Sequence, residues 1–169
     1  MHIPFFFLII LFVLWLGYEV HKNNRAAKDS SKEFWARESE ALMTPRKPID
    51  DVKFIEIPDE IIPAKSVSPD NDTEREINEL ISELEALKKR QMADLSDYTN
   101  TDLRLKYGTV NFTRLSDADT AFARVVQIMP ALISNLKTSG RTGEADVLLQ
   151  FCERANISSN AINKLKNEP

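Results

Sequence analysis

The sequence SDADTAFARVVQIMPALISNLKTSG, residues 116–140, decides the fold class of this chain. Ser116 and Asp119 have the spacing of a capping box, in which a hydroxyl and a side chain three residues later satisfy free amides at a helix start. The apolar residues that follow have helical spacing and form the broadest apolar face in the sequence, namely Phe122, Val125, Val126, Met129, Leu132, Ile133 and Leu136. The pattern predicts an amphipathic helix that ends at Gly140, with a kink or break before Pro130 because proline lacks an amide hydrogen.

A second helix is expected directly after this one, with Thr142 as its N-cap. Its apolar face consists of Ala145, Leu148, Leu149, Cys152 and Ala155. The two helices are expected to pack antiparallel as an αα-hairpin, which resembles a degenerate tetratricopeptide repeat with Ala145 as the small residue between them. A last short helix is expected from Ser158 or Ser159 through Leu165.

Besides a short helix over residues 34–43, two further helices are expected between residues 72 and 116. Thr73 and Glu76 form a capping-box pattern at the start of the first. Its apolar stripe consists of Ile77, Leu80, Leu84 and Leu87. This stripe either packs within the chain or pairs with a second copy. The other helix covers residues 100–107 and ends at Gly108, since glycine favours the left-handed conformation that terminates helices.

Prolines mark the segment that precedes these helices. Five of the eight prolines lie within residues 45–69, and the apolar residues between 51 and 58 are typical of an extended segment. No second convincing strand is present to pair with it. We therefore predict an all-α protein in which residues 21–71 form a juxtamembrane tether and an extended proline-rich arm, laid on a small helical bundle of residues 72–167.

The N-terminal residues 3–20 are expected to form a single transmembrane helix. Between Ile3 and Leu16 only Pro4 is not hydrophobic, and the first charged residue is Glu19. Such a run covers most of the hydrocarbon core of a bilayer. A cleaved signal peptide is the alternative, but no Lys or Arg precedes the run and no small-residue cleavage site follows it.

The distribution of cations predicts how this helix is oriented. Lys and Arg follow the apolar run and do not precede it, at Lys22, Arg25, Lys28 and Lys32. Because cations favour the cytoplasmic side, we expect a single-pass protein of the cell membrane with its N-terminus outside and its helical body in the cytoplasm. The lone Cys152 agrees with a reducing compartment. The lipid bilayer is thus an expected partner of residues 3–20.

Three segments carry a resemblance to a protein family: FWARESE at residues 34–40, PIDDVKFIEIP at 48–58 and LSDYTNTDLRLKYG at 95–108. They resemble a group of small membrane-anchored proteins of clostridial-type Gram-positive bacteria, over about residues 34–165. The resemblance implies a bacterial origin, an anchored architecture and a C-terminal helical pair. It implies no enzymatic activity and no site residues.

Several kinds of chemistry are excluded by composition. The two histidines, His2 and His21, precede the helical part, and Cys152 is the single cysteine. The usual Ser–His and Cys–His catalytic pairs and the common zinc sites therefore cannot form there. No glycine-rich phosphate-binding motif occurs, and the net charge of −4 disfavours binding to nucleic acid. We expect no catalytic residue, no cofactor, no metal and no nucleic-acid partner.

Two functions remain. The favoured one is a membrane-tethered protein–protein interaction module, an adaptor or scaffold without catalytic activity. It would present a face made of Phe122, Val126, Met129 and Leu136 to an unknown protein partner. The alternative is a self-associating structural membrane protein, with a homodimer formed through the stripe of Ile77, Leu80, Leu84 and Leu87.

Overall fold

The computed structural model describes residues 5–157 and 160–167. Its elements are α1 (Phe5–Met43), the 3-10 helix η1 (Asp59–Ile61), α2 (Asp72–Lys88), α3 (Asn100–Tyr107), α4 (Thr109–Thr138), α5 (Thr142–Arg154) and α6 (Asn160–Asn167). All the elements in these ranges are helical, so the predicted all-α class is confirmed. The proposed helix start at Ser158 or Ser159 lies outside the described residues.

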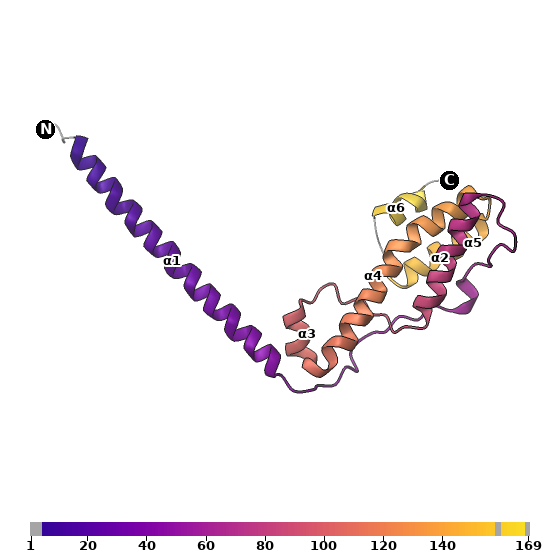
Figure 1. Ribbon diagram of the computed structural model, residues 1–169, viewed down its shortest axis with the longest axis horizontal. Coiled ribbons are helices and arrows are strands. Elements are labelled where there is room, and N and C mark those ends of the chain that lie inside the picture. The colour runs from indigo at the N-terminus through magenta and orange to yellow at the C-terminus, as the bar shows by residue number, and fades with distance from the viewer. Residues whose placement is uncertain (1–4, 158–159, 168–169) are drawn as a thin grey trace.

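Figure 1 shows a bundle from which one helix projects. Helices α2, α5 and α6 pack around α4, while α3 packs between the first turns of α4 and the end of α1. The main core lies among α2, α4, α5 and α6. Its fully buried side chains include Ile77, Ile81, Leu84, Leu132, Ile133, Leu136, Leu148 and Ile162. Burial of each large side chain is worth about 1.5 to 3 kcal/mol, so this contact area is the main source of stability.

Helix α4 is longer than the sequence pattern predicted. It begins at Thr109, not at Ser116, and continues through Pro130 without a break. Gly108 precedes it with φ of 85°, a left-handed conformation that ends α3 and turns the chain into α4. The predicted start at Ser116 was wrong because the Asp119 carboxylate accepts a hydrogen bond from the Leu95 amide and does not cap its own helix.

The predicted hairpin of α4 and α5 is present. Gly140 has φ of 80°, and the amides of Gly140 and Arg141 donate to the carbonyls of Lys137 and Leu136 at 3.1 and 2.9 Å. This is the Schellman arrangement of a helix C-terminus. Ala145 is fully buried, which allows α5 to pack closely on α4.

The proline-rich segment is an extended arm on the bundle. Ile57 and Ile61 are 3% and 6% exposed and belong to the main core. The Ile55 amide donates to the Met92 carbonyl at 2.8 Å, and this antiparallel bridge is the only β-type pairing within the described residues. The arm is therefore held by both apolar burial and a backbone hydrogen bond.

Helix α1 corrects the expectation for the N-terminal segment. Within the described part of the chain, no helix is long and apolar enough to cross a membrane. The uncharged part of α1 ends at Tyr18, and Glu19 and Lys22 continue the same helix. The prediction of a single-pass transmembrane helix was therefore wrong. The predicted localisation in the cell membrane, with the N-terminus outside and the body in the cytoplasm, was wrong for the same reason.

The expected tether is also different from the structure. Residues 21–32 were expected to belong to a juxtamembrane tether, but they lie inside α1, which is continuous from Phe5 to Met43. The segment contains no proline and several good helix formers, so a helix that has begun upstream can propagate through it. The last turns of α1 contact α3 and the start of α4.

Candidate functional site

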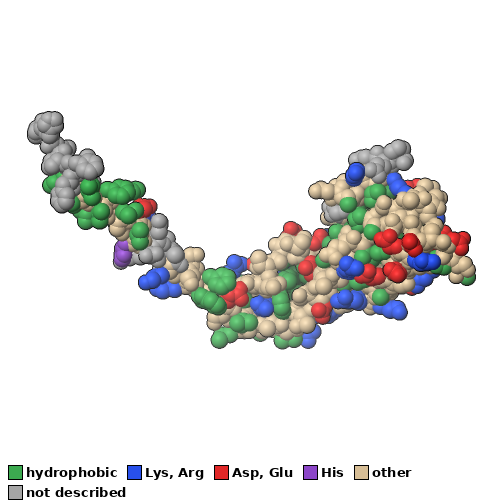
Figure 2. Space-filling model, turned by 45° about the horizontal axis from the view of Figure 1, so that its top comes forward, with side chains coloured by type: hydrophobic (Ala, Val, Ile, Leu, Met, Phe, Trp, Pro, Cys, Tyr) green, Lys and Arg blue, Asp and Glu red, His purple; other side chains and the backbone are tan. Residues whose placement is uncertain are grey.

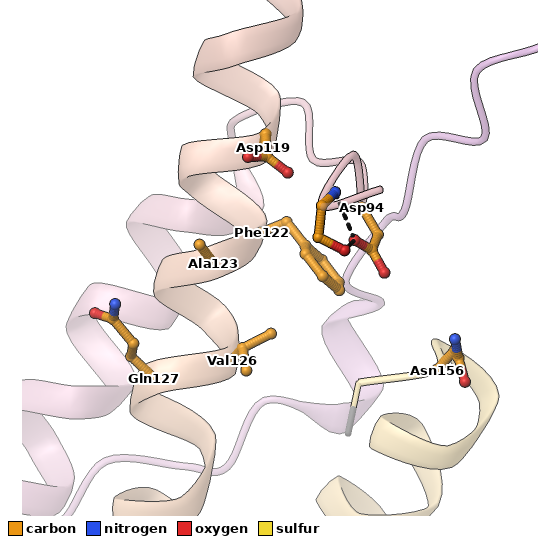
Figure 3. A pocket seen from close by; sticks show the side chains of 8 residues that line it. Asp94, Asp119, Phe122, Ala123, Val126, Gln127 and Asn156 are labelled. Atoms are coloured by element: carbon orange, nitrogen blue, oxygen red, sulfur yellow. Dashed lines mark hydrogen bonds between the residues drawn. The ribbon is translucent and has the colours of Figure 1, made fainter. Parts of the chain in front are cut away.

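An open groove of about 450 Å³ lies beside α4. It is lined by Asp94, Ser96, Asp119, Phe122, Ala123, Val126, Gln127 and Asn156. Figure 3 shows that these side chains come from α4, from the turn that follows Met92, and from the end of α5. Three separate parts of the chain thus form its walls.

The first wall is one face of α4. Asp119, Phe122, Ala123, Val126 and Gln127 follow one another at helical spacing, so their side chains share one side of the helix. The Phe122 ring points toward the turn at Asp94 and is 8% exposed, whereas Val126 is half-buried and Ala123 is exposed. This wall has an apolar floor with a carboxylate at one end.

The second wall is the turn at residues 93–96. The Asp94 Oδ1 atom accepts hydrogen bonds from the Ser96 amide and hydroxyl at 3.2 and 2.7 Å, which closes an Asx turn. Two further bonds fasten the turn to α4: the Leu95 amide donates to Asp119 Oδ1 at 3.0 Å, and the Ala93 amide donates to the Ala118 carbonyl at 3.3 Å. The two carboxylates are therefore held in fixed positions.

The third wall is the residue after α5. Asn156 has φ of 55°, and its amide donates to the Glu153 carbonyl at 3.2 Å. The next amide, of Ile157, donates to the Cys152 carbonyl at 2.8 Å, which completes a second Schellman arrangement. Asparagine tolerates the left-handed conformation better than most residues, so the sequence places an exposed amide side chain at this edge.

The charged residues that line the groove are Asp94 and Asp119, and both are acidic. A second hollow of about 660 Å³ shares Asp94 and Asn156 with the groove and extends toward Tyr98 and Lys106. The two hollows therefore adjoin, and together they form a longer depression across this side of the bundle.

The second hollow is lined by the cations Lys53, Lys106 and Arg154 as well as by the acids Asp51, Asp94 and Asp97. Lys106 Nζ lies 3.0 Å from Asp51 Oδ2 and donates to the Tyr98 hydroxyl at 2.9 Å. Hydrogen bonds to Tyr107, Tyr98 and Asp51 raise the pKa of Lys106, and its ammonium lowers the pKa of Asp51. The Lys106–Asp51 pair is self-compensating. The second hollow thus has mixed charge, whereas the residues that line the groove itself include two acids and no cation.

The four residues of the predicted partner-binding face have two different environments. Phe122 and Val126 line the groove, although Phe122 is buried and also belongs to the main core, whereas Met129 and Leu136 are fully buried and do not line the groove. The difference follows from helix length, since α4 has 30 residues and α5 has 13. Helix α5 covers the C-terminal part of α4 and ends before it reaches Phe122.

The predicted self-association stripe lies mostly in the core. Ile77 and Leu84 are fully buried, Leu87 is 5% exposed, and Leu80 is partly buried against the same core. Helix α2 packs on α4 through this face. The stripe therefore stabilises the fold of a single chain and presents no continuous apolar surface.

The structure adds site residues that the sequence pattern missed, namely Asp94, Ser96 and Asn156. Asp94 and Ser96 have the spacing of an Asx turn, and that spacing is the local signal that could have identified them. Cys152 lies outside the groove, and burial raises the pKa of its thiol to about 11. It is a packed side chain with little thiolate at neutral pH.

Fold and site together define a small helical-bundle protein with an open, acidic and apolar groove. Comparison with protein-family models, with curated proteins and with solved structures found no match. The resemblance to membrane-anchored proteins of Gram-positive bacteria therefore stays a prediction. In the part of the chain that the structure describes, no group of three or more His, Cys, Asp or Glu side chains is placed to hold a metal ion.

Proposed function

We propose that this protein is a protein–protein interaction module, an adaptor or scaffold that binds a segment of a partner protein in the groove beside α4. The observation that supports this is the apolar floor of the groove, formed by the edge of the buried Phe122 ring, the half-buried Val126 and the exposed Ala123, with the fixed carboxylates of Asp94 and Asp119 beside it. Apolar contact gives affinity, and charge at the edge of an interface gives specificity.

The lining of the groove defines the chemistry of the partner. A large apolar side chain of the partner fits the floor between Phe122 and Val126. Its burial there is favourable because apolar surface of the partner and of both residues is removed from water. A Lys or Arg side chain fits the edge, since Asp94 and Asp119 are acidic and the lining contains no cation. The partner segment therefore combines one cationic and one apolar side chain.

The dimensions favour an extended segment over a single small molecule. The groove and the adjoining hollow share Asp94 and Asn156, and they have volumes of about 450 and 660 Å³. Two adjoining hollows of this volume accommodate several residues of an extended chain. A binding function without catalysis is also consistent with the absence of histidine after His21.

Selection from a displayed library of random peptides tests this proposal. The full chain is the target, and the Ala123→Arg variant removes peptides that do not depend on the groove. Ala123 is exposed on α4, so arginine is compatible with the helix while it fills the groove with bulk and positive charge. We expect the retained peptides to share a Lys or Arg next to a large apolar residue.

The matched control is Ala86→Arg, which makes the same change at an exposed alanine of α2. Retained peptides should bind this variant as they bind the unmodified chain. Circular dichroism checks that both variants keep their helix content. If every peptide binds Ala123→Arg as well as Ala86→Arg, the groove is not the binding site and the proposal is wrong.

A further inference from the structure

A second surface of the molecule is independent of the groove. Among the described side chains, eleven of the exposed large hydrophobic residues lie in the N-terminal half of α1: Phe7, Ile9, Ile10, Leu11, Phe12, Val13, Leu14, Trp15, Leu16, Tyr18 and Val20. Figure 2 shows green side chains gathered on the part of the molecule that projects from the bundle. We call residues 7–20 the apolar segment.

Apart from Glu19, the apolar segment has no polar side. The successive residues Val13, Leu14, Trp15 and Leu16 are 58%, 65%, 58% and 47% exposed. Each residue of an α-helix is rotated by about 100° from the one before, so four successive residues point to four different sides. A helix that is apolar all round is normally covered by other protein or by lipid.

The bundle of the same chain cannot cover this segment. Helix α1 has 39 residues, which corresponds to a length of about 58 Å at about 1.5 Å per residue. Its last turns are fixed to the bundle by side chains of α3 and α4. Arg37 Nη2 lies 2.5 Å from Asp102 Oδ1. Thr109 Oγ1 donates to the carbonyls of Ala41 and Leu42, each at 3.0 Å. The apolar segment is thus held away from the core of its own chain.

The exposed area is sufficient for a stable association. Eleven side chains of this size, each about half exposed, present on the order of 1,000 Å² of apolar surface. A standard protein–protein interface buries about 800 Å² on each partner. Because this surface surrounds the helix, one neighbouring helix buries only part of it, and the whole of it is covered only when more copies pack together.

Charge distribution favours an antiparallel arrangement of two such helices. Between residues 19 and 32 the cations Lys22, Arg25, Lys28 and Lys32 outnumber the acids Glu19 and Asp29. In a parallel pair the two cationic stretches would lie next to each other and repel. In an antiparallel pair the apolar segments overlap and the cationic stretches, like the two bundles, lie at opposite ends.

We infer that the apolar segment binds the same segment of a second copy of this chain in antiparallel orientation. Phe7 of one copy then lies near Val20 of the other, and Leu14 lies near the centre of the interface. One neighbour covers one side of each helix, so two antiparallel pairs can combine through the remaining apolar sides. The stripe of α2 takes no part, because it is buried within each chain.

Sedimentation velocity of the full chain tests this inference. The unmodified chain is expected to sediment as two or four copies, and Leu14→Glu is expected to sediment as a monomer. Leu14 is 65% exposed in a helix, so glutamate does not disturb its own fold. Val67→Glu is the matched control, since Val67 is 99% exposed in the arm, and it should leave the assembly unchanged.

Disulfide formation tests the orientation. A mixture of Phe7→Cys and Val20→Cys chains is expected to form the mixed disulfide faster than either chain alone forms a disulfide with itself. Preferred disulfides between identical positions would overturn the antiparallel arrangement. A monomeric unmodified chain would overturn self-association, as would a chain that stays monomeric and binds phosphatidylcholine vesicles through the same segment.

Discussion

Gly108 is the residue on which the junction of α3 and α4 depends. Its φ is 85°, and a Cβ at this position would overlap the carbonyl oxygen of Pro45. Gly108→Ala is therefore expected to lower the free energy of unfolding by about 2 to 4 kcal/mol, because it combines backbone strain with displacement of the arm. Urea denaturation measures this change.

The control for Gly108 is a glycine that has free space around it. Gly143 lies in the first turn of α5, and a Cβ there meets no atom within 4 Å. Gly143→Ala is expected to change the stability by less than about 1 kcal/mol and to raise it if anything, since alanine favours the helix. Equal effects of the two substitutions would contradict the role given to Gly108.

Cys152 gives a prediction about pH. Burial raises its thiol pKa from 9.0 to about 11 in the folded chain, so the unfolded chain loses this proton first as the pH rises. The stability that the neutral, buried Cys152 thiol contributes is fully present below pH 9.0 and is lost between pH 9.0 and about 11. Between about pH 8 and about pH 10, the free energy of unfolding should fall for both chains. The fall should be about 1 kcal/mol larger for the unmodified chain than for Cys152→Ala.

Urea denaturation of both chains at the two pH values measures this difference. Other groups that titrate in the same range act equally on both chains and cancel in the comparison. A pH dependence that is the same with and without Cys152 would show that the thiol is accessible to water in the folded state.

At the level of single residues, part of the site could be predicted from sequence. Helical spacing placed Phe122 and Val126 on one face of a helix, and both line the groove. The same spacing also selected Met129 and Leu136, which are buried because α5 covers them. Local pattern does not contain the length of a neighbouring helix, so it could not separate the two pairs.

Among the elements, the arm makes a testable contribution to stability. Ile57 is 3% exposed and belongs to the main core although it lies in an extended segment. Ile57→Ala is expected to destabilise the chain by about 2 to 4 kcal/mol, through lost burial and a cavity. Chemical denaturation followed by circular dichroism measures this change.

Val67 provides the comparison for the arm, because it is 99% exposed. Val67→Ala should change the stability by less than about 0.5 kcal/mol. If Ile57→Ala also has no effect, then the arm is not part of the cooperative fold.

The helices were predictable in kind and less so in extent. The spacing of Thr142, Ala145 and Leu148 correctly predicted α5, because apolar periodicity and the preceding glycine agree. The expected caps were wrong by one or two residues, since Asn71 caps α2 in place of Thr73 and Arg141 holds the N-cap position of α5 in place of Thr142. The start of α4 and the course of residues 21–32 were also wrong. A tertiary contact of Asp119 bears on the start of α4, and propagation from the preceding turns explains the helix over residues 21–32. Neither cause leaves a pattern in the local sequence.

Across the whole molecule, two surfaces are left uncovered for different reasons. The groove exists because α4 is longer than the helix that packs on it, and the apolar segment exists because α1 extends beyond the bundle. The groove is acidic at its edge, whereas the stretch of α1 after the apolar segment is cationic. Binding in the groove and association through α1 can therefore be measured separately, with variants that leave the other surface intact.

The central claim is that the groove binds a peptide with a cationic and an apolar side chain. Fluorescence anisotropy of a labelled peptide from the selection, titrated with the full chain, tests it most directly. Ala123→Arg should raise the Kd at least about tenfold, while Ala86→Arg stays within about twofold. Asp119→Asn keeps the acceptor for the Leu95 amide but removes the charge, so it should raise the Kd about three- to tenfold, less so at high salt. Equal Kd values for all four chains would contradict the account.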